Sequence, residues 1–319
     1  MKAFVRKPIE GLFPLMPLCL KDNQDIDYDG IRRNVDLLES KGIPGFIQFG
    51  CMGQMNAPSE EEFNKVCDVC VDACKGKQIA CVVASTSTNT KEAIRRATYA
   101  EDAGADGTML MAPYAFPVKS EWAVDFYSEV DDALRGDMTM ILYNIPSMNG
   151  VNVTSSMWRD RLLGLKSIRA VKDSNMAIPH HDESILAVAE TINWFSCTDA
   201  NFWVDSQLGA RGIVGIMSWV ALRAMRKWYD DCLAGKQQDE WVRKLYKALV
   251  EAWGAIRHDV VHPDFYMAYE HGRLNLFAEI GGGVGGHPRR PYERYSPDVE
   301  KEIRKLVRPL VMMEEEMDS

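Results

Sequence analysis

A lysine ends one of the short apolar runs of this sequence, Ile168–Lys172. Strand alternation places Lys172 on the face opposite Val171, and Val171 suits the side that packs against helices, so Lys172 should point toward the interior. Burial disfavours the charged form of an amine, and a free amine attacks a ketone to give an imine, an electron sink for making or breaking a carbon–carbon bond. The alternative is a solvated lysine, or one paired with Asp173 or Asp199, and this feature alone leaves both open.

A tyrosine ends the preceding apolar run, Thr139–Tyr143. If consecutive runs form neighbouring parallel strands, their ends meet at the same rim, and Tyr143 then lies beside Lys172. A phenol beside an amine can shuttle protons while a carbinolamine forms and loses water. Considered alone, a core tyrosine with a satisfied hydroxyl is the more ordinary interpretation.

The elements that must position these side chains recur along the chain as short apolar runs, each followed by an amphipathic segment. Such repetition is typical of βα units and a parallel sheet, and this many units within about 220 residues favour a closed barrel. The predicted fold class is α/β, a (β/α)8 TIM barrel with a C-terminal helical extension. The candidate strands are Gly11–Leu18, Gly45–Phe49, Ile79–Ala84, Thr108–Ala112, Thr139–Tyr143, Ile168–Lys172, Trp194–Cys197 and Gly212–Met217.

The pattern changes after Ser218, where helical periodicity continues without intervening strands. We expect helices over Val220–Ala234, over Gln238–Arg257 and from Pro297 to about Met313. The predicted division is a barrel over residues 1–220 and a helical appendage over residues 221–319.

Composition excludes several classes of partner. The formal net charge of −9 disfavours a nucleic-acid binder, which needs a dense basic surface. No run approaches the roughly 18 to 20 apolar residues that span a bilayer, and the N-terminus lacks a signal-type pattern. We therefore expect a cytoplasmic enzyme that acts on small molecules, with its eight cysteines reduced and with Cys67, Cys70 and Cys74 buried on the inner face of a helix.

Two motifs could suggest a ligand site, but we prefer a structural interpretation of each. Residues Gly281–Gly286 match Gly-x-Gly-x-x-Gly, but the His-Pro-Arg-Arg-Pro that follows cannot readily open a helix, which favours a loop packed on the barrel over a nucleotide site. His180 and His181 lie in a predicted loop, Asn175–Glu183, where adjacent side chains point apart. We expect them to face solvent or the substrate rim, and we predict no metal site.

Two motifs in this order and spacing resemble the dihydrodipicolinate synthase / N-acetylneuraminate lyase family of class I, Schiff-base-forming pyruvate aldolases. They are Tyr-Asn-Ile-Pro-Ser-x-x-Gly at Tyr143–Gly150 and Ala-Val-Lys-Asp-Ser at Ala170–Ser174. The resemblance covers most of the chain and also includes Gly50–Gln54, Ser59–Glu62, Ala103–Gly107, Pro113–Tyr114 and Gly209–Gly215.

This resemblance implies that Lys172 is the imine lysine and Tyr143 the proton-relay phenol. It further implies that the covalent imine at Lys172 replaces any cofactor. The implied substrates are pyruvate or another small 2-oxo acid and an aldehyde, and the implied assembly is a homodimer or homotetramer. The predicted substrate-binding residues are Gly50, Cys51, Met52, Tyr114, Met148 and Val214.

The departures from the family pattern are informative. Cys51 and Met52 stand where the family loop has two hydroxyl residues that bind the pyruvate carboxylate and complete the proton relay, although backbone amides of this loop could still hold a carboxylate. Ala115 replaces the second tyrosine of Pro-Tyr-Tyr, and Met148 replaces the substrate-carboxylate arginine of the synthase. We therefore expect a divergent member that is not dihydrodipicolinate synthase itself, with a larger or more apolar pocket that suits a hydrophobic aldehyde.

Three functions remain open. The first is reversible aldol or hydratase-aldol cleavage of a 2-oxo acid through an imine at Lys172. The second is a hydro-lyase that dehydrates a sugar-acid-derived 2-oxo acid through the same imine, and it ranks lower because sugar acids demand polar walls. The third is a non-catalytic barrel that binds 2-oxo acids, which the retention of both Lys172 and Tyr143 disfavours.

Overall fold

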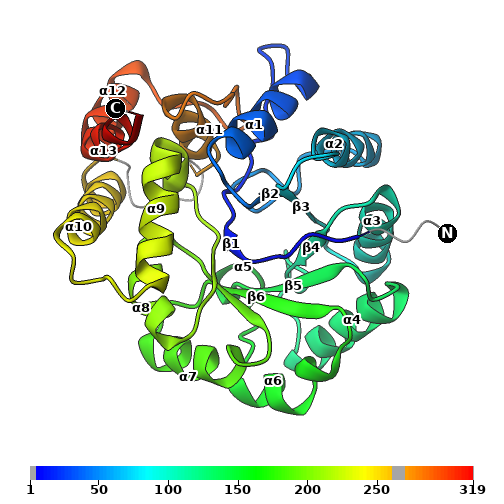
Figure 1. Ribbon diagram of the computed structural model, residues 1–319. Coiled ribbons are helices and arrows are strands. Elements are labelled where there is room, and N and C mark those ends of the chain that lie inside the picture. Colours follow the sequence, from blue (N-terminus) through cyan, green and yellow to red (C-terminus); the bar gives the residue numbers. More distant parts are fainter. Residues whose placement is uncertain (1–4, 261–269, 319) are drawn as a thin grey trace.

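The computed structural model describes residues 5–260 and 270–318. Its strands surround a common axis and helices cover their outer side, so the predicted (β/α)8 TIM barrel is confirmed (Figure 1). The strands are β1 (Gly11–Leu12), β2 (Gly45–Gln48), β3 (Ala80–Ala84), β4 (Gly107–Leu110), β5 (Thr139–Asn144), β6 (Ile168–Asp173), β7 (Asn193–Ser196) and β8 (Gly212–Ile213).

All strand pairs in the described barrel are parallel, in the order β1-β8-β7-β6-β5-β4-β3-β2. The barrel closes between β1 and β2 through a bridge from Leu15 to Ile47. The predicted strand Gly11–Leu18 is therefore only partly correct. Pro14 and Pro17 have no N–H to donate to a sheet ladder, so regular pairing stops after Leu12.

Two aromatic rings fill the barrel interior next to the site. Phe13 and Phe195 pack edge to face with their ring centroids 5.5 Å apart. Glycines leave room for them, because a Cβ on Gly45 would lie 2.2 Å from the Phe13 ring and a Cβ on Gly212 would lie 2.3 Å from the Phe195 ring. Since Phe195 is the register partner of Lys172, the lysine emerges beside a packed apolar layer and not from an open channel.

Local signals account for several helix ends. Ser59 and Glu62 form the predicted capping box at the start of α2, with both reciprocal hydrogen bonds present. Gly104 ends α3 in the left-handed region, at φ 105°. The helices that cover the barrel are α1 (Tyr28–Ser40), α2 (Glu60–Ala73), α3 (Thr90–Ala103), α4 (Ser120–Ala133), α6 (Ser155–Asp160), α7 (Ile178–Val188) and α8 (Phe202–Leu208), with the short turns α5 (Pro146–Asn149) and η1 (Leu162–Gly164) between them.

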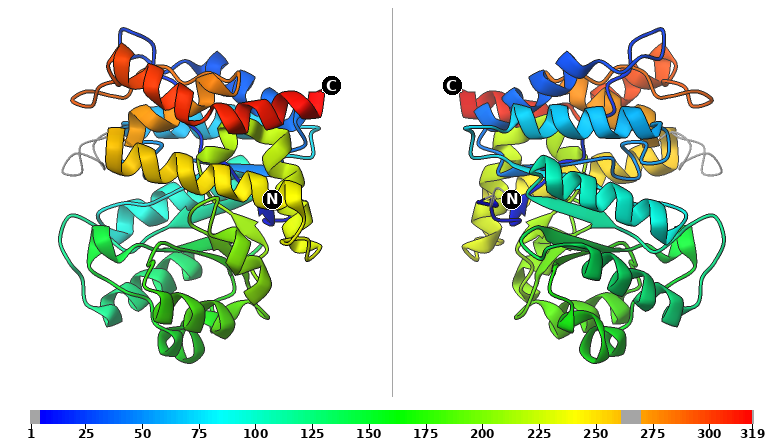
Figure 2. Two further views of the ribbon diagram at one scale, coloured as in Figure 1. Left: turned by 90° about the vertical axis from the view of Figure 1, so that its left-hand side faces the viewer. Right: turned by 90° about the vertical axis from the view of Figure 1, so that its right-hand side faces the viewer.

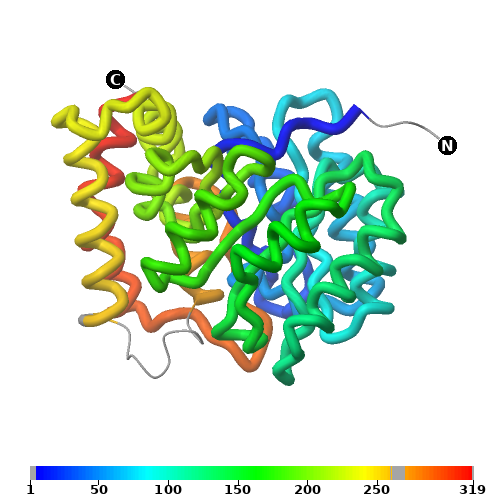
Figure 3. The backbone as a smooth tube through the Cα atoms, turned by 90° about the horizontal axis from the view of Figure 1, so that it is seen from below, coloured from blue at the N-terminus to red at the C-terminus, as the bar shows by residue number. Residues whose placement is uncertain are grey.

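The helices after β8 pack along one side of the barrel (Figures 2 and 3). They are η2 (Met217–Ala221), α9 (Leu222–Leu233), α10 (Glu240–Ala255), the π-helical turn η3 (Ile256–Val260), α11 (Glu270–Ile280), α12 (Pro297–Leu306) and α13 (Arg308–Asp318). The helical extension is confirmed, but its last predicted helix is two helices that meet at Val307. Its division from the barrel at residue 220 stays a prediction. None of the helices in residues 5–260 and 270–318 is long and apolar enough to cross a membrane.

The sequence analysis missed helix α11. Eight of its eleven residues are buried, so it lacks the one-sided apolar stripe that marks an amphipathic helix. The glycine-rich segment Gly281–Gly286 follows this helix and not a strand, and it packs on α1. There the Val284 N–H donates to the Asn34 Oδ1 at 2.7 Å, and the Asn34 amide donates back to the Val284 carbonyl at 2.8 Å. The predicted loop packed on the barrel is therefore confirmed.

Candidate active site

Tyr143 and Lys172 lie side by side at the carboxyl ends of β5 and β6, where they are register partners. Both side chains point into the barrel and are almost fully buried, with 2% and 3% exposed. The Lys172 Nζ lies over the face of the Tyr143 ring, 4.3 Å from its centroid. The structure thus brings together the two residues that the sequence singled out.

The next residues along both strands hold the strand ends together on the outer face. Asn144 donates through Nδ2 to both carboxylate oxygens of Asp173 at 2.9 Å, and the Asn175 N–H donates to the same carboxylate at 2.8 Å. His180 approaches Asp173 through Nε2 at 3.1 Å. Because Asp173 is engaged here, it does not neutralise Lys172.

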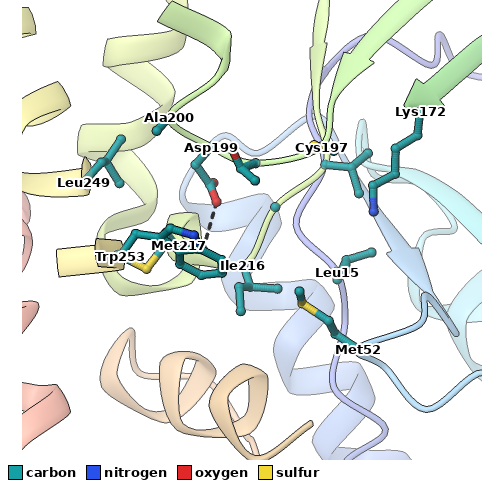
Figure 4. Close-up of a pocket in the computed structure, with 13 residues that line it drawn as sticks. Leu15, Met52, Lys172, Cys197, Asp199, Ala200, Ile216, Met217, Leu249 and Trp253 are labelled. Carbon is teal, nitrogen blue, oxygen red and sulfur yellow. Dashed lines mark hydrogen bonds between the residues drawn. The ribbon is translucent and has the colours of Figure 1, made fainter. Parts of the chain in front are cut away.

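The other acid considered as a partner of Lys172 is also occupied. Asp199 accepts from the backbone N–H groups of Met217 and Ser218 at 3.0 and 3.1 Å, and Figure 4 shows the Met217 bond dashed. In the part of the chain that the structure describes, no carboxylate lies within ion-pair distance of Lys172. The structure therefore favours a buried reactive amine over a lysine held in a salt bridge.

The Tyr143 hydroxyl faces two small polar side chains. The Ser174 hydroxyl donates to it at 3.5 Å, and the Cys51 Sγ lies 3.5 Å away on the other side. Burial raises the pKa of Tyr143 well above its usual range, with a further contribution from Cys51. The phenol is therefore neutral at neutral pH and keeps a proton that it can donate. We did not predict Ser174 as a site residue, although it stands two positions after Lys172.

Two adjoining cavities open at the Lys172 amine and share Met52, Cys197 and Trp253 in their walls. The smaller cavity, about 50 Å³, is also lined by Leu15 and Val214. Figure 4 shows Leu15 and Met52 beside the Lys172 amine. The larger, about 1040 Å³, also contains Tyr143 and Cys51. The predicted site residues Cys51, Met52 and Val214 thus line the space around the amine.

Three other predicted substrate-binding residues, Gly50, Tyr114 and Met148, lie outside both linings. Gly50 is buried against Leu15, where a Cβ would lie 2.6 Å from the leucine Cδ2, so its role is close packing of the loop. Tyr114 and Met148 are half-buried and pack against the core. Pro146 starts the single helical turn α5, and this turn presents Ser147 to the cavity in place of Met148.

Of the two histidines expected to face solvent or the substrate rim, His181 lies at the cavity, whereas His180 contacts Asp173. The expected loop Asn175–Glu183 becomes helix α7 from Ile178 onward, because the proline at its second position suits a first helical turn. His181 is buried, lines the larger cavity and lies 3.6 Å from Asp205, which raises the pKa of its imidazole. Within residues 5–260 and 270–318, His, Cys, Asp and Glu side chains form no group of three that could hold a metal ion.

The walls of the larger cavity combine apolar and polar surfaces. The exposed apolar side chains Met176, Ile178, Val204 and Val250 all lie in its lining. The polar members of the lining include His181, Asp182, Asn201, Asp205, Arg257, His258 and Glu270. The expected apolar wall is present in part, since Cys51 and Met52 line the cavity and Ala115 and Met148 do not. The polar side chains of the lining were not foreseen, because they come from α7, η3, α11, and α8 with the residue before it.

Comparison with known proteins identifies a family and relatives that are similar to this chain. The model of the Dihydrodipicolinate synthetase family matches residues 8–308. The 4-hydroxy-tetrahydrodipicolinate synthase of Methanothrix thermoacetophila is 31% identical over 235 residues, which cover 70% of this chain and 75% of that protein.

Solved structures share the fold. YagE of E. coli, a prophage protein of the dihydrodipicolinic acid synthase family solved in complex with pyruvate, superposes with a TM-score of 0.84 at 17% identity. The match covers 95% of this chain and 98% of YagE. A catalytic lysine mutant of the sialic acid aldolase of Ruminococcus gnavus gives a TM-score of 0.84 at 18% identity, covering 97% of this chain and 99% of the aldolase.

Proposed function

Because the chain belongs to the Dihydrodipicolinate synthetase family, we propose that it is a Schiff-base lyase in which Lys172 forms an imine with pyruvate or a closely related 2-oxo acid. Class I aldolases of this family act through a covalent imine on a lysine and use no metal or organic cofactor. The observation that carries the proposal is the Lys172 amine, buried over the Tyr143 ring and open to both cavities.

The first chemical step follows from this arrangement. The Lys172 amine adds to the keto carbon, the keto oxygen takes up a proton, and the resulting carbinolamine loses water to give the imine. Tyr143 is the neutral acid that reaches this oxygen, and Cys51 and Ser174 orient its hydroxyl. We further propose that the backbone of the Gly50–Gln54 loop holds the substrate carboxylate, since its side chains at positions 51 and 52 are a thiol and a thioether.

For the second substrate we propose an aldehyde with a hydrophobic body, in an aldol or hydratase-aldol cleavage. The exposed apolar surface in the lining of the larger cavity, from Met176, Ile178, Val204 and Val250, supports this substrate class. Together with Met148 in place of an arginine, it argues for an activity other than that of dihydrodipicolinate synthase. We propose that the protein works as a homodimer or homotetramer, which light scattering during gel filtration measures directly.

The polar side chains in the lining of the same cavity support a second candidate, the dehydration of a sugar-acid-derived 2-oxo acid. His181, Asp205 and Asn201 could bind several hydroxyl groups at once. Assays of retro-aldol cleavage on adducts of aromatic aldehydes, and of water loss from polyhydroxylated 2-oxo acids, distinguish the two candidates by their kcat/KM values.

The imine itself is tested without knowing the second substrate. Pyruvate and borohydride should add one reduced pyruvate unit to the protein, and peptide mapping should place it on Lys172. The Lys172→Ala variant should form no adduct. If neither pyruvate nor any simple 2-oxo acid is trapped by the wild-type protein, the lyase proposal fails and a non-catalytic binding barrel is favoured.

A further inference from the structure

Glu270 is a buried carboxyl group at the proposed site that comes from outside the barrel. It is the first residue of α11, in the C-terminal extension, and only 6% of its surface is exposed. Its side chain lines the larger cavity together with Lys172, Cys51 and Met52. No motif in the sequence points to it, because residue 270 lies about 100 positions from the lysine motif.

A hydrogen bond attaches the start of α11 to the loop that departs from the family pattern. His271 donates through Nδ1 to the Met52 carbonyl oxygen at 2.9 Å, and its ring packs edge-on against Tyr292 with centroids 4.6 Å apart. Burial lowers the pKa of His271, which keeps the imidazole neutral. The carboxyl of Glu270 is therefore held next to the loop position where Met52 has replaced a hydroxyl.

A buried arginine orients this carboxyl group. Arg273 lies one turn along α11, its side chain is fully buried, and one guanidinium nitrogen lies 3.7 Å from Glu270 Oε1. The same guanidinium stacks on Trp253 at 5.0 Å from the ring centroid. Trp253 also lines both cavities, so this stack connects the carboxyl group to the cavity wall.

The proposed chemistry needs a base, and the two side chains described beside the amine, Tyr143 and Cys51, do not supply one. Once the pyruvate imine has formed, a proton must leave its methyl carbon, C3, to give the nucleophilic enamine. Burial raises the pKa of both Tyr143 and Cys51, so at neutral pH both are acids. Burial also raises the pKa of Glu270 above 4.5, against the opposing charges of Arg273, Lys172 and Arg257, which brings this base closer to neutral pH.

We propose that Glu270 moves the proton at C3 of the pyruvate imine. This step rests on the imine at Lys172 proposed above. In the protonated form of the imine, the Glu270 carboxylate takes the proton from C3, the C3–H electron pair forms the C2=C3 double bond, and the C=N electron pair moves to the positively charged nitrogen to give the neutral enamine. When an aldehyde leaves in the cleavage direction, the Glu270 carboxylic acid returns its proton to C3. The C-terminal extension thereby supplies a proton-transfer group to the barrel.

Hydrogen–deuterium exchange at the pyruvate methyl group tests this step without any aldehyde. The wild-type protein in D2O should deplete the methyl signal of pyruvate in a proton NMR spectrum. Glu270→Gln should slow the exchange by about 100-fold or more while the borohydride adduct at Lys172 still forms. Glu251→Gln is the matched control, since Glu251 is an exposed residue of α10 paired with Lys247, and its exchange should equal that of the wild type.

A second variant guards against a purely structural effect. Glu270→Ala should be rescued by added formate, whose carboxylate fits the space that the substitution opens. Wild-type exchange in Glu270→Gln with a normal adduct would overturn the role of Glu270 but leave the imine intact. The role of Glu270 would also be overturned if Glu270→Gln lost both the adduct and the exchange. The same holds if Glu270→Ala formed the adduct but added formate did not restore its exchange. Absence of the adduct in the wild type would instead defeat the proposed function.

The pH dependence of the exchange rate is a further test, because a purely structural role of Glu270 would not produce it. Exchange by the wild-type protein should fall as the pH drops through the raised pKa of Glu270, because the carboxylate is lost. Among the described residues, the groups that interact electrostatically with it are Arg273 on α11, Arg257 on η3, Lys172 on β6 and Cys51 on the Gly50–Gln54 loop. The residual exchange of Glu270→Gln should lack this acidic limb, and its persistence there would contradict the assignment.

Discussion

The Lys172 Nζ lies over the face of the Tyr143 ring, 4.3 Å from its centroid, and the hydroxyl of that ring contacts Cys51 and Ser174. The tyrosine therefore has two separable parts. Its ring lies against the Lys172 nitrogen, and its hydroxyl is the group to which we assign the proton transfer.

Tyr143→Phe should separate these two parts. The variant keeps the ring over Lys172, so the borohydride adduct should still form, but the loss of the acid should slow turnover by roughly 100-fold or more. Tyr143→Leu removes the ring as well and should also reduce adduct formation. Wild-type turnover in Tyr143→Phe would show that the phenol is not the proton donor.

Cys51 is expected to act as a hydrogen-bond partner of the phenol and not as a nucleophile. Burial raises the pKa of its thiol, which disfavours the reactive thiolate. Cys51→Ser keeps a partner for Tyr143 and should hold kcat near wild type, whereas Cys51→Ala should lower it by about fivefold, the value of a net hydrogen bond of about 1 kcal/mol. Equal rates in the two variants would argue against a contribution from the Cys51 contact.

The His181–Asp205 pair should make stability depend on pH. Asp205 raises the folded-state pKa of His181 above 6.5, so the stabilisation is complete below pH 6.5 and is lost as the pH rises through the folded-state value. Urea unfolding at about pH 5.5 should show the wild type more stable than His181→Gln by about 1 kcal/mol, and this difference should shrink at about pH 8.5. Asp205→Asn should abolish the pH dependence, and a difference that grows with pH would contradict the sign.

Two glycine substitutions should change stability in opposite directions. Gly212→Ala places a Cβ 2.3 Å from the Phe195 ring inside the barrel and should destabilise the protein by about 1 to 3 kcal/mol. Gly254 lies within α10, where a Cβ meets open space, so Gly254→Ala should stabilise it by about 0.5 to 1 kcal/mol. Thermal unfolding of both variants measures these changes. Melting temperatures that shift in the same direction in both variants would show that the side chains around Phe195 move to make room for the added Cβ.

The residues at the strand ends could be predicted because their signals are local. Alternation within Ile168–Lys172 determines which face the lysine occupies, and the order of the βα units places Tyr143 on the adjacent strand. Ser59 and Glu62 likewise act within one helical turn, so their capping box was visible in the sequence. Such features need no knowledge of distant contacts.

Tertiary structure decided which side chains reach the cavity from elsewhere. Helix α11 is buried on nearly all sides and has no periodic pattern, so neither the helix nor Glu270 could be placed from the sequence. The helical turn α5 places Ser147 and not Met148 at the cavity, and helix α7 places His181 on its buried side. The sequence by itself determined the barrel and its lysine–tyrosine pair, because strand alternation and βα order are local properties. The packing of distant helices decided the rest of the cavity wall, because it depends on contacts between residues far apart in the chain.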